Sequence, residues 1–375
     1  MLLALLLSAT LFLAWSNGAN DNFKGVATLW GSRTATFRQA LTWATGGTVL
    51  GSLVSVAIAG TLVARFSGKG VVEDSLIDPK MLTAIGAAGA ITIFLATLLR
   101  MPTSTTHALT GALVGAGWVA AGASNLDWGV LGTKFAQPLL LSPALAILGT
   151  ATIYPGLRRA RRLAGIDRET CLCVGTEDLR PVAIGTAAAI DTTTAPGVTL
   201  GTTAACTERY RGSLLGLDAQ TAVDAVHYLS AGAVCFARAV NDTPKIAALL
   251  LAAGGIAGGF STLTLLGVAI AMAAGGWVQS RGVAETMSLR ITQLNPGQGL
   301  TANLLTAFLV LGASRLGLPV STTHVSCGSI FGIGIATRTA DRGIVFQIFT
   351  TWVTTLPLGL LLGALCYRGL TALGS

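Results

Sequence analysis

Long apolar stretches separated by short polar segments dominate the chain. Four of these stretches contain no charged residue: 40–64, 81–99, 103–124 and 344–366. A membrane-spanning helix needs about 20 mainly apolar residues, so the pattern predicts several transmembrane helices. The first residues, MLLALLLSATLFLAW, lack a basic start and run into a polar NGAND. We therefore expect a retained first helix rather than a cleaved signal peptide.

An internal repeat runs through the apolar stretches. Three pairs of segments correspond: NGANDNFKG at 17–25 with ARAVNDTPK at 237–245, PTSTTHALTGALVGAG at 102–117 with PVSTTHVSCGSIFGIG at 319–334, and FAQPLLLSPALAILG at 135–149 with FTTWVTTLPLGLLLG at 349–363. The second pair shares eight of its sixteen positions, and the offsets of the three pairs are 221, 217 and 214 residues. Three landmarks in the same order indicate a duplicated chain.

The number of crossings in each half decides how the two copies are oriented. In the first half we expect a helix at 2–16 that is interrupted at NGAND and resumes to about residue 30, followed by helices at 38–64, 79–99, 103–121 and 128–153. About five crossings is an odd number, so the second copy would be inverted. Inverted repeats place a binding site near the bilayer midplane, at broken helices in corresponding positions.

The sequence thus predicts an all-α polytopic membrane protein built from two inverted repeats, 1–153 and 217–375. The broken segments NGAND and AVNDTP and the hydroxyl-rich STTH segments would meet at the midplane.

A more polar segment, 154–216, separates the repeats. Its TTT and VTLGTT runs are typical of short strands and turns, so we expect a small extramembrane domain. The basic run RRARR at 158–162 directly follows an apolar segment. Because positive residues collect on the cytoplasmic side of membranes, this domain is expected in the cytoplasm.

Composition supports a membrane protein and excludes a soluble one. Of the 375 residues, 52% are hydrophobic and 11% are charged, whereas soluble domains carry about 25% charged residues. The lipid bilayer of the cell membrane is therefore the expected surrounding. The net charge of +8 comes from residues scattered at helix ends, so we expect no nucleic-acid partner.

Two aspartates occupy equivalent places in the repeat, each directly after an asparagine. Asp21 and Asp242 lie in apolar surroundings, where a carboxylate is costly and by default functional. A helix cap in headgroup water is the alternative, and it is weaker for a symmetric pair. Carboxylate oxygens suit Na⁺ or a proton, so we assign both aspartates to the coupling ion, as metal ligands if that ion is Na⁺. Asn20 and Asn241 are candidates for phosphate binding.

The STTH segments offer a different chemistry. Ser and Thr after a proline can cap a helix start, whose free N–H groups and partial positive charge suit an oxyanion such as phosphate. The candidate phosphate ligands are Ser104, Thr105, Thr106, Ser321, Thr322 and Thr323. Capping and helix packing would suffice to explain one copy, but two copies favour an anion site. His107 and His324 would either fix the loop or relay a proton.

Other classes of function fit less well. No H-E-x-x-H, G-x-S-x-G or P-loop motif is present, so we expect neither an enzyme nor a cofactor beyond the coupling ion. A cation channel or exchanger could be built on the paired Asn-Asp motifs. Hydroxyl-rich helix starts argue against it, because their positive dipole ends repel cations.

The paired motifs resemble those of the inorganic phosphate transporter family, called PiT. GAND stands at 18–21, VND at 240–242, PTSTTH at 102–107 and PVSTTH at 319–324, and the likeness covers roughly 1–153 and 218–370. The resemblance implies symport of inorganic phosphate with Na⁺ or H⁺, both termini outside, a cytoplasmic central loop and often a homodimer. Some members of that family move sulfate instead.

One feature departs from the family pattern. The family continues its first motif with small residues, as in NDVANA, whereas this chain has NDNFKG and NDTPKI. Lys24 and Lys245 thus stand three residues after Asp21 and Asp242, on the same helix face. Each ammonium group could stand where Na⁺ would sit, or attract the anion. The alternative is that both lysines extend to the headgroups.

Overall fold

The computed structural model describes most of the helical part of the chain and short pieces of the central segment. The described residues are 1–163, 167–169, 173–176, 196–199, 209–211, 213–214, 217–253 and 262–373. They divide into two compact units, one made of Met1–Leu157 and Val223–Ser375, the other of Arg158–Ala222.

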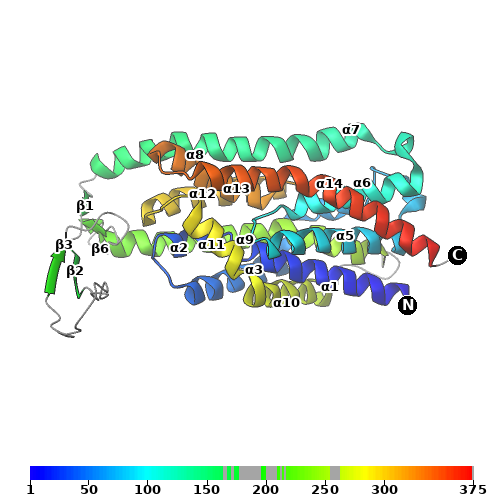
Figure 1. Cartoon of the computed structure of the whole chain (residues 1–375), viewed down its shortest axis with the longest axis horizontal. Helices are drawn as coiled ribbons and strands as arrows, with labels where there is room; N and C mark the ends of the chain where they lie inside the picture. Colours follow the sequence, from blue (N-terminus) through cyan, green and yellow to red (C-terminus); the bar gives the residue numbers. More distant parts are fainter. Residues whose placement is uncertain are drawn as a thin grey trace, which may run out of the picture. The chain divides into compact units, whose positions relative to one another are not determined.

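Ten helices of 16 residues or more make up most of the described part of the chain (Figure 1). Those of the first half are α1 (Leu2–Asp21), α3 (Phe37–Ala59), α5 (Pro79–Leu98), α6 (Thr105–Ala121) and α8 (Gln137–Leu163). Those of the second half are α9 (Ala219–Ala253), α10 (Thr262–Gln279), α12 (Pro296–Arg315), α13 (Thr322–Thr337) and α14 (Arg342–Ala372).

Shorter helical pieces connect the long helices. They are α2 (Ala27–Gly31), α4 (Thr61–Phe66), α7 (Trp128–Val130), α11 (Arg281–Glu285), the 3-10 turns Asp74–Leu76 and Ala123–Asn125, and the π-helical turns Leu131–Ala136 and Thr286–Arg290.

The central unit contains three antiparallel strand pairs. They are β1 (Asp167–Glu169) with β4 (Arg209–Arg211), β2 (Cys173–Thr176) with β3 (Pro196–Thr199), and β5 (Ser213–Leu214) with β6 (Leu217–Asp218). In register, Asp167 faces Arg211 and Cys173 faces Thr199. β3 contains the first two residues of the predicted VTLGTT run, while the TTT run at 192–194 lies outside the described residues.

The first helix breaks later than the sequence analysis expected. α1 continues through NGAND to Asp21, and turns at residues 22–26 then lead into α2. Backbone bonds of the i to i−3 kind, from Lys24 to Asp21 and from Val26 to Phe23, hold this turn. Gly25 is needed there because a Cβ at this position would lie 2.4 Å from Cys235 Sγ on α9.

The predicted break at AVNDTP is wrong, because α9 runs unbroken from Ala219 to Ala253 with Pro244 inside it. A proline removes a single backbone donor, and surrounding helices and polar side chains compensate for such a loss inside membranes. The polar side chains of this segment already point to their partners from an intact helix, so no break is needed to present them.

Each STTH helix begins one residue after its serine. The side chains of Ser104 and Ser321 cap α6 and α13 by accepting the backbone N–H groups of His107 and His324. The prolines therefore precede the caps and lie outside the helices, where their missing N–H costs no helical hydrogen bond.

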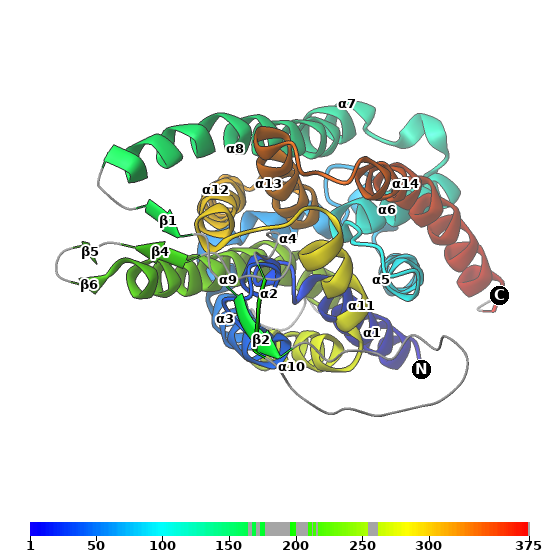
Figure 2. The same cartoon turned by 60° about the vertical axis from the view of Figure 1, so that its left-hand side comes forward.

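In two places a helix of one half packs against a helix of the other half. α6 packs on α14 and α13 packs on α8, so each STTH helix lies against the last long helix of the other half (Figure 2). Glycines make the close approach possible: a Cβ at Gly115 would lie 2.0 Å from the Leu360 carbonyl oxygen, and one at Gly332 would lie 2.5 Å from that of Ile147. Small residues serve this purpose at helix contacts in membranes.

Five helical stretches of the described residues are long and apolar enough to cross a membrane: Leu2–Asp21, Pro79–Leu98, Trp128–Leu163, Thr262–Gln279 and Arg342–Ala372. α8 exposes a series of leucines that includes Leu140, Leu141, Leu145 and Leu148, a surface too apolar for water. The N-terminus on α1 and the C-terminus on α14 lie at one end of the helical unit (Figure 1).

The contact between α6 and α14 gives a stability prediction. Gly115→Ala should lower the free energy of unfolding by about 1–3 kcal/mol, because the added methyl group collides with the α14 backbone. Gly312→Ala on α12 is the matched control, since no atom lies within 4 Å of its added Cβ, and it should gain about 0.5–1 kcal/mol. Unfolding in detergent measures both variants, and equal stabilities would contradict the prediction.

Candidate functional site

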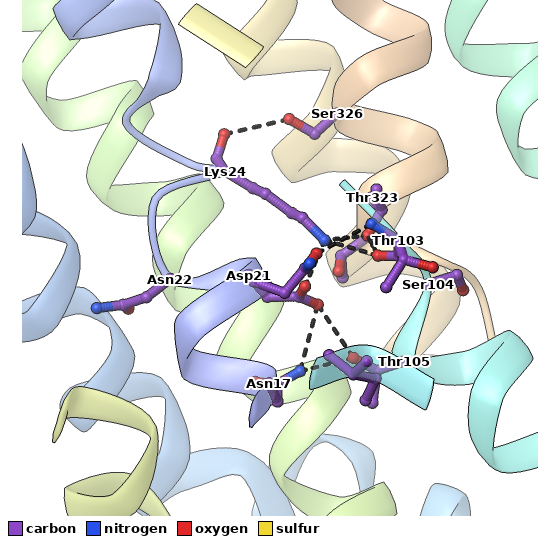
Figure 3. Close-up of polar contacts among 12 residues, drawn as sticks. Asn17, Asp21, Asn22, Lys24, Thr103, Ser104, Thr105, Thr323 and Ser326 are labelled. Carbon is purple, nitrogen blue, oxygen red and sulfur yellow. Dashed lines mark hydrogen bonds and ion pairs between the residues drawn. The ribbon is translucent and has the colours of Figure 1, made fainter. Parts of the chain in front are cut away.

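Four segments meet at one buried polar cluster: the end of α1 with its following turn, the middle of α9, and the starts of α6 and α13. Its side chains are those of Asn17, Asn20, Asp21, Lys24, Ser104, Thr105, Thr106, Arg238, Asn241, Asp242, Lys245, Ser321, Thr322 and Thr323, and each is at most 5% exposed. All twelve predicted site residues are among them. Figure 3 shows the part around Lys24.

Lys24 joins the first half to the second half. Its ammonium group pairs with the Asp21 carboxylate and donates to Thr323 Oγ1 at the start of α13. It also donates to the Thr103 carbonyl oxygen at 2.7 Å, and Thr323 Oγ1 donates to that same carbonyl (Figure 3). The Lys24 backbone carbonyl in turn accepts from Ser326. Lys24 is thus fixed within the cluster and does not reach the headgroups.

Lys245 makes the equivalent contacts in the opposite direction. Its ammonium group lies 3.3 Å from Asp242 Oδ1 and 2.7 Å from Thr106 Oγ1 at the start of α6. It also donates to the Val320 carbonyl oxygen at 3.1 Å, and Thr106 Oγ1 donates to that same carbonyl at 3.0 Å. Each lysine therefore binds the aspartate of its own half and a threonine of the other half.

Asn17 lies between the two aspartates. Its Nδ2 is 3.2 Å from Asp21 Oδ2, 3.3 Å from Asp242 Oδ2 and 2.8 Å from Thr105 Oγ1. Thr105 also donates to Asp21 Oδ2 at 3.2 Å, and on the other side Thr322 Oγ1 lies 3.5 Å from Asp242 Oδ2. One amide group thus holds both carboxylates close together at the centre of the cluster.

Arg238 adds a third positive charge to the cluster. Its guanidinium donates to Asn17 Oδ1 at 3.0 Å, to Asn22 Oδ1 at 3.2 Å and to Thr48 Oγ1 at 2.6 Å, whereas its buried Nε has no partner among the described residues. Together, Arg238, Lys24 and Lys245 carry three positive charges, whereas the two aspartates carry two negative charges. A buried site with excess positive charge suits an anion.

The two asparagines of the Asn-Asp pairs hold the segments that precede the STTH helices. Asn20 accepts from the Thr103 N–H at 2.9 Å and donates to the Met101 carbonyl at 3.0 Å. Asn241 donates to the Val320 carbonyl at 3.2 Å and accepts from Ser314 at 3.1 Å. These amides are engaged in positioning the loops, so their predicted contact with phosphate stays a prediction.

No group of three or more His, Cys, Asp or Glu side chains able to hold a metal ion occurs in the described part of the chain. Asp21 and Asp242 are the residues that would hold Na⁺. Each already has an ammonium group as its partner, so a cation at either carboxylate would have to displace a lysine.

Sequence reasoning missed Asn17 and Arg238. The repeat offset of 221 residues pairs the two, and the structure joins them by a hydrogen bond. A signal was present, because Arg238 is a charged residue inside an apolar helical stretch, which by default indicates function. It also precedes Asp242 by four residues and therefore shares its helix face.

Comparisons with known proteins identify the family of the chain. A family model described as the phosphate transporter family matches residues 17–363. The chain is 29% identical to a "Probable low-affinity inorganic phosphate transporter" of Rhizobium meliloti over 98% of this chain and 96% of the relative. It is 28% identical to the chloroplastic inorganic phosphate transporter 2-1 of Arabidopsis thaliana, over 93% of this chain and 68% of the relative.

One solved structure has a similar fold. It is titled "The sodium-dependent phosphate transporter", with a TM-score of 0.75, 22% sequence identity and coverage of 99% of both chains.

The buried ion pairs predict an unusual pattern of mutant stabilities. Asp21→Asn should lower the free energy of unfolding by about 3–5 kcal/mol, because it leaves the Lys24 ammonium buried without a counter-charge. Adding Lys24→Met should recover much of that loss, since no unpaired charge then remains. Unfolding in detergent tests this, and a double variant no more stable than Asp21→Asn alone would refute it.

Proposed function

The chain belongs to the phosphate transporter family, and from this membership and the polar cluster we propose that it is a secondary active symporter of inorganic phosphate driven by Na⁺ or H⁺. The observation that carries the proposal is the buried cluster with three positive and two negative side chains between two helix starts. As a member of this family, with several apolar helices, the chain is a membrane protein.

Phosphate would bind between the starts of α6 and α13. Both helix N-termini direct free N–H groups and a partial positive charge to the cluster, and Thr105, Thr106, Thr322 and Thr323 add hydroxyl donors. Thr106 and Thr323 accept hydrogen bonds from Lys245 and Lys24. An arriving phosphate would take these ammonium and hydroxyl groups as its own donors, which is the geometry of a charge-assisted anion site.

The coupling ion is the second part of the proposal. The ammonium groups of Lys24 and Lys245 pair with the two aspartates that would otherwise hold Na⁺. This favours a mechanism in which no Na⁺ binds at the cluster. The similar fold belongs to a protein titled as sodium-dependent, so Na⁺ remains the alternative. With a proton as coupling ion, Asp21 and Asp242 would serve as counter-charges that keep the lysines charged.

Two inverted repeats are the proposed architecture. The exchanged contacts support it, because each lysine reaches the threonine of the opposite half and each STTH helix packs on the opposite half. Together with the two termini at one end of the helical unit (Figure 1), they fit a cytoplasmic central segment 154–216 and both termini outside. A homodimer in the cell membrane is the assembly that we expect.

A sulfate permease of the same fold is the main alternative substrate assignment, since sulfate offers the same oxygen acceptors. The charge balance of the cluster weighs against a cation channel or exchanger, because an excess positive charge repels cations.

Uptake into proteoliposomes tests the function. Labelled phosphate should accumulate when an inward proton gradient is imposed, and replacing Na⁺ with K⁺ should leave the rate within about twofold, since an ammonium group already neutralises each aspartate. Empty liposomes are the control. Inhibition by excess sulfate equal to that by phosphate would move the assignment to sulfate, and no uptake of either ion would refute the proposal.

The hydroxyl groups give a separate prediction. Thr105→Val and Thr322→Val keep the volume but remove a donor, and a lost hydrogen bond to a charged group costs about 1.5–3 kcal/mol. Each should raise the phosphate dissociation constant about 10- to 150-fold, measured by calorimetry. Thr350→Val is the control, since the Thr350 hydroxyl bonds only the backbone of its own helix α14 among the described residues. If both Thr105→Val and Thr322→Val bind phosphate as tightly as the unchanged protein, these threonines serve only in helix capping and packing.

A further inference from the structure

A pair of neighbouring histidines lies directly behind the threonines of the cluster. His107 and His324 occupy equivalent places in the first turns of α6 and α13, with ring centroids 4.5 Å apart. The His324 ring also stacks on Trp352 of α14, at 3.9 Å between centroids. Each histidine directly follows a threonine that binds a lysine, Thr106 or Thr323. The pair therefore borders the anion site without lying in it.

His324 is buried with its hydrogen-bonding capacity unused. It is 3% exposed, and neither ring nitrogen has a hydrogen-bond partner within the described residues; Trp352 Nε1 likewise has none. A buried polar group without a partner is costly and calls for an explanation. A neutral imidazole presents one N–H and one lone pair, so His324 keeps a free lone pair that can accept a proton.

The surroundings supply an acceptor for the resulting imidazolium. The Leu139 backbone carbonyl on α8 lies beside His324. Pro143, four residues later inside α8, has no N–H with which a regular helix would bond this carbonyl. A protonated His324 would have two N–H donors, one of which could use the Leu139 carbonyl.

His107 connects His324 to the surface of the helical unit. It is partly exposed, and its Nδ1 lies 2.9 Å from Ser104 Oγ, the cap of α6. The charged groups that act on the two rings are Lys245 of α9 for His107 and Lys24 for His324. No carboxylate of the described residues pairs with either ring. The positive charge of both lysines repels a proton on either ring.

We propose that the His107–His324 pair is the site that takes up the coupling proton when the anion binds. This rests on the proposed phosphate transport and names its coupling ion. A phosphate between the helix starts brings negative charge beside the lysines and removes the repulsion that keeps the rings neutral. Two imidazoles this close together in a buried site cannot both be charged, so the pair holds one proton. The proton comes from water through His107 and leaves with the anion.

Gradient-driven accumulation tests this site. In proteoliposomes with the membrane potential clamped to zero, an inward gradient of one pH unit should concentrate phosphate about tenfold if one proton accompanies it. His107→Gln and His324→Gln should each reduce the accumulation to about onefold, since glutamine keeps hydrogen bonding but takes up no proton. Phosphate–phosphate counterflow, which needs no net proton movement, should persist within about threefold. Gel filtration checks the fold of each variant.

His227→Gln is the matched control. His227 is the third histidine of the chain and is also buried, but its Nε2 bonds Thr28 away from the cluster. This variant should accumulate phosphate like the unchanged protein.

Three outcomes would overturn the proposal while leaving phosphate transport intact: accumulation by His107→Gln and His324→Gln equal to the control, accumulation driven only by a Na⁺ gradient, or loss of counterflow together with accumulation in folded variants. Absence of phosphate transport in the unchanged protein would instead refute the proposed function itself, and the proton site with it.

Discussion

Two buried ion pairs constrain the rest of this structure. Removing an ammonium or a carboxylate from water costs several kcal/mol per ion, of order 20 kcal/mol in the idealised limit, and the cost is offset only where further hydrogen bonds complete the pair. For Lys24–Asp21 and Lys245–Asp242, these bonds come from threonine hydroxyls and backbone carbonyls at the starts of α6 and α13. The helix starts must therefore lie where the ion pairs need them.

The same requirement makes each half incomplete without the other. The partner that Lys24 lacks in its own half is Thr323, and the partner that Lys245 lacks is Thr106. The glycine contacts of α6 with α14 and of α13 with α8 repeat this exchange away from the cluster. The two halves thus contribute complementary sides of the cluster, and these contacts join the halves into one helical unit.

Chemistry in the cluster separates into layers. Asn17 bonds both aspartates at the centre, the lysines and Arg238 contact this centre, and the threonines stand at the helix starts, with the two neighbouring histidines directly after them. In the proposed mechanism the anion binds to the threonines and lysines, while the proton binds to the histidines. Neighbouring sites of opposite charge stabilise one another through space, and such a coupling free energy is what symport requires.

The sequence by itself determined the long helices, because about 20 apolar residues form a span whatever surrounds them, and the repeat singled out Asp21, Asp242, Lys24 and Lys245 as candidates for one site. Only the tertiary structure decided that α9 passes intact through Pro244, that Asn20 and Asn241 hold loops, and that Arg238 meets Asn17. The last two depend on contacts between residues that lie 73 to 83 positions apart in the sequence for the loops and 221 positions apart for Arg238. Local periodicity carries no information about such contacts.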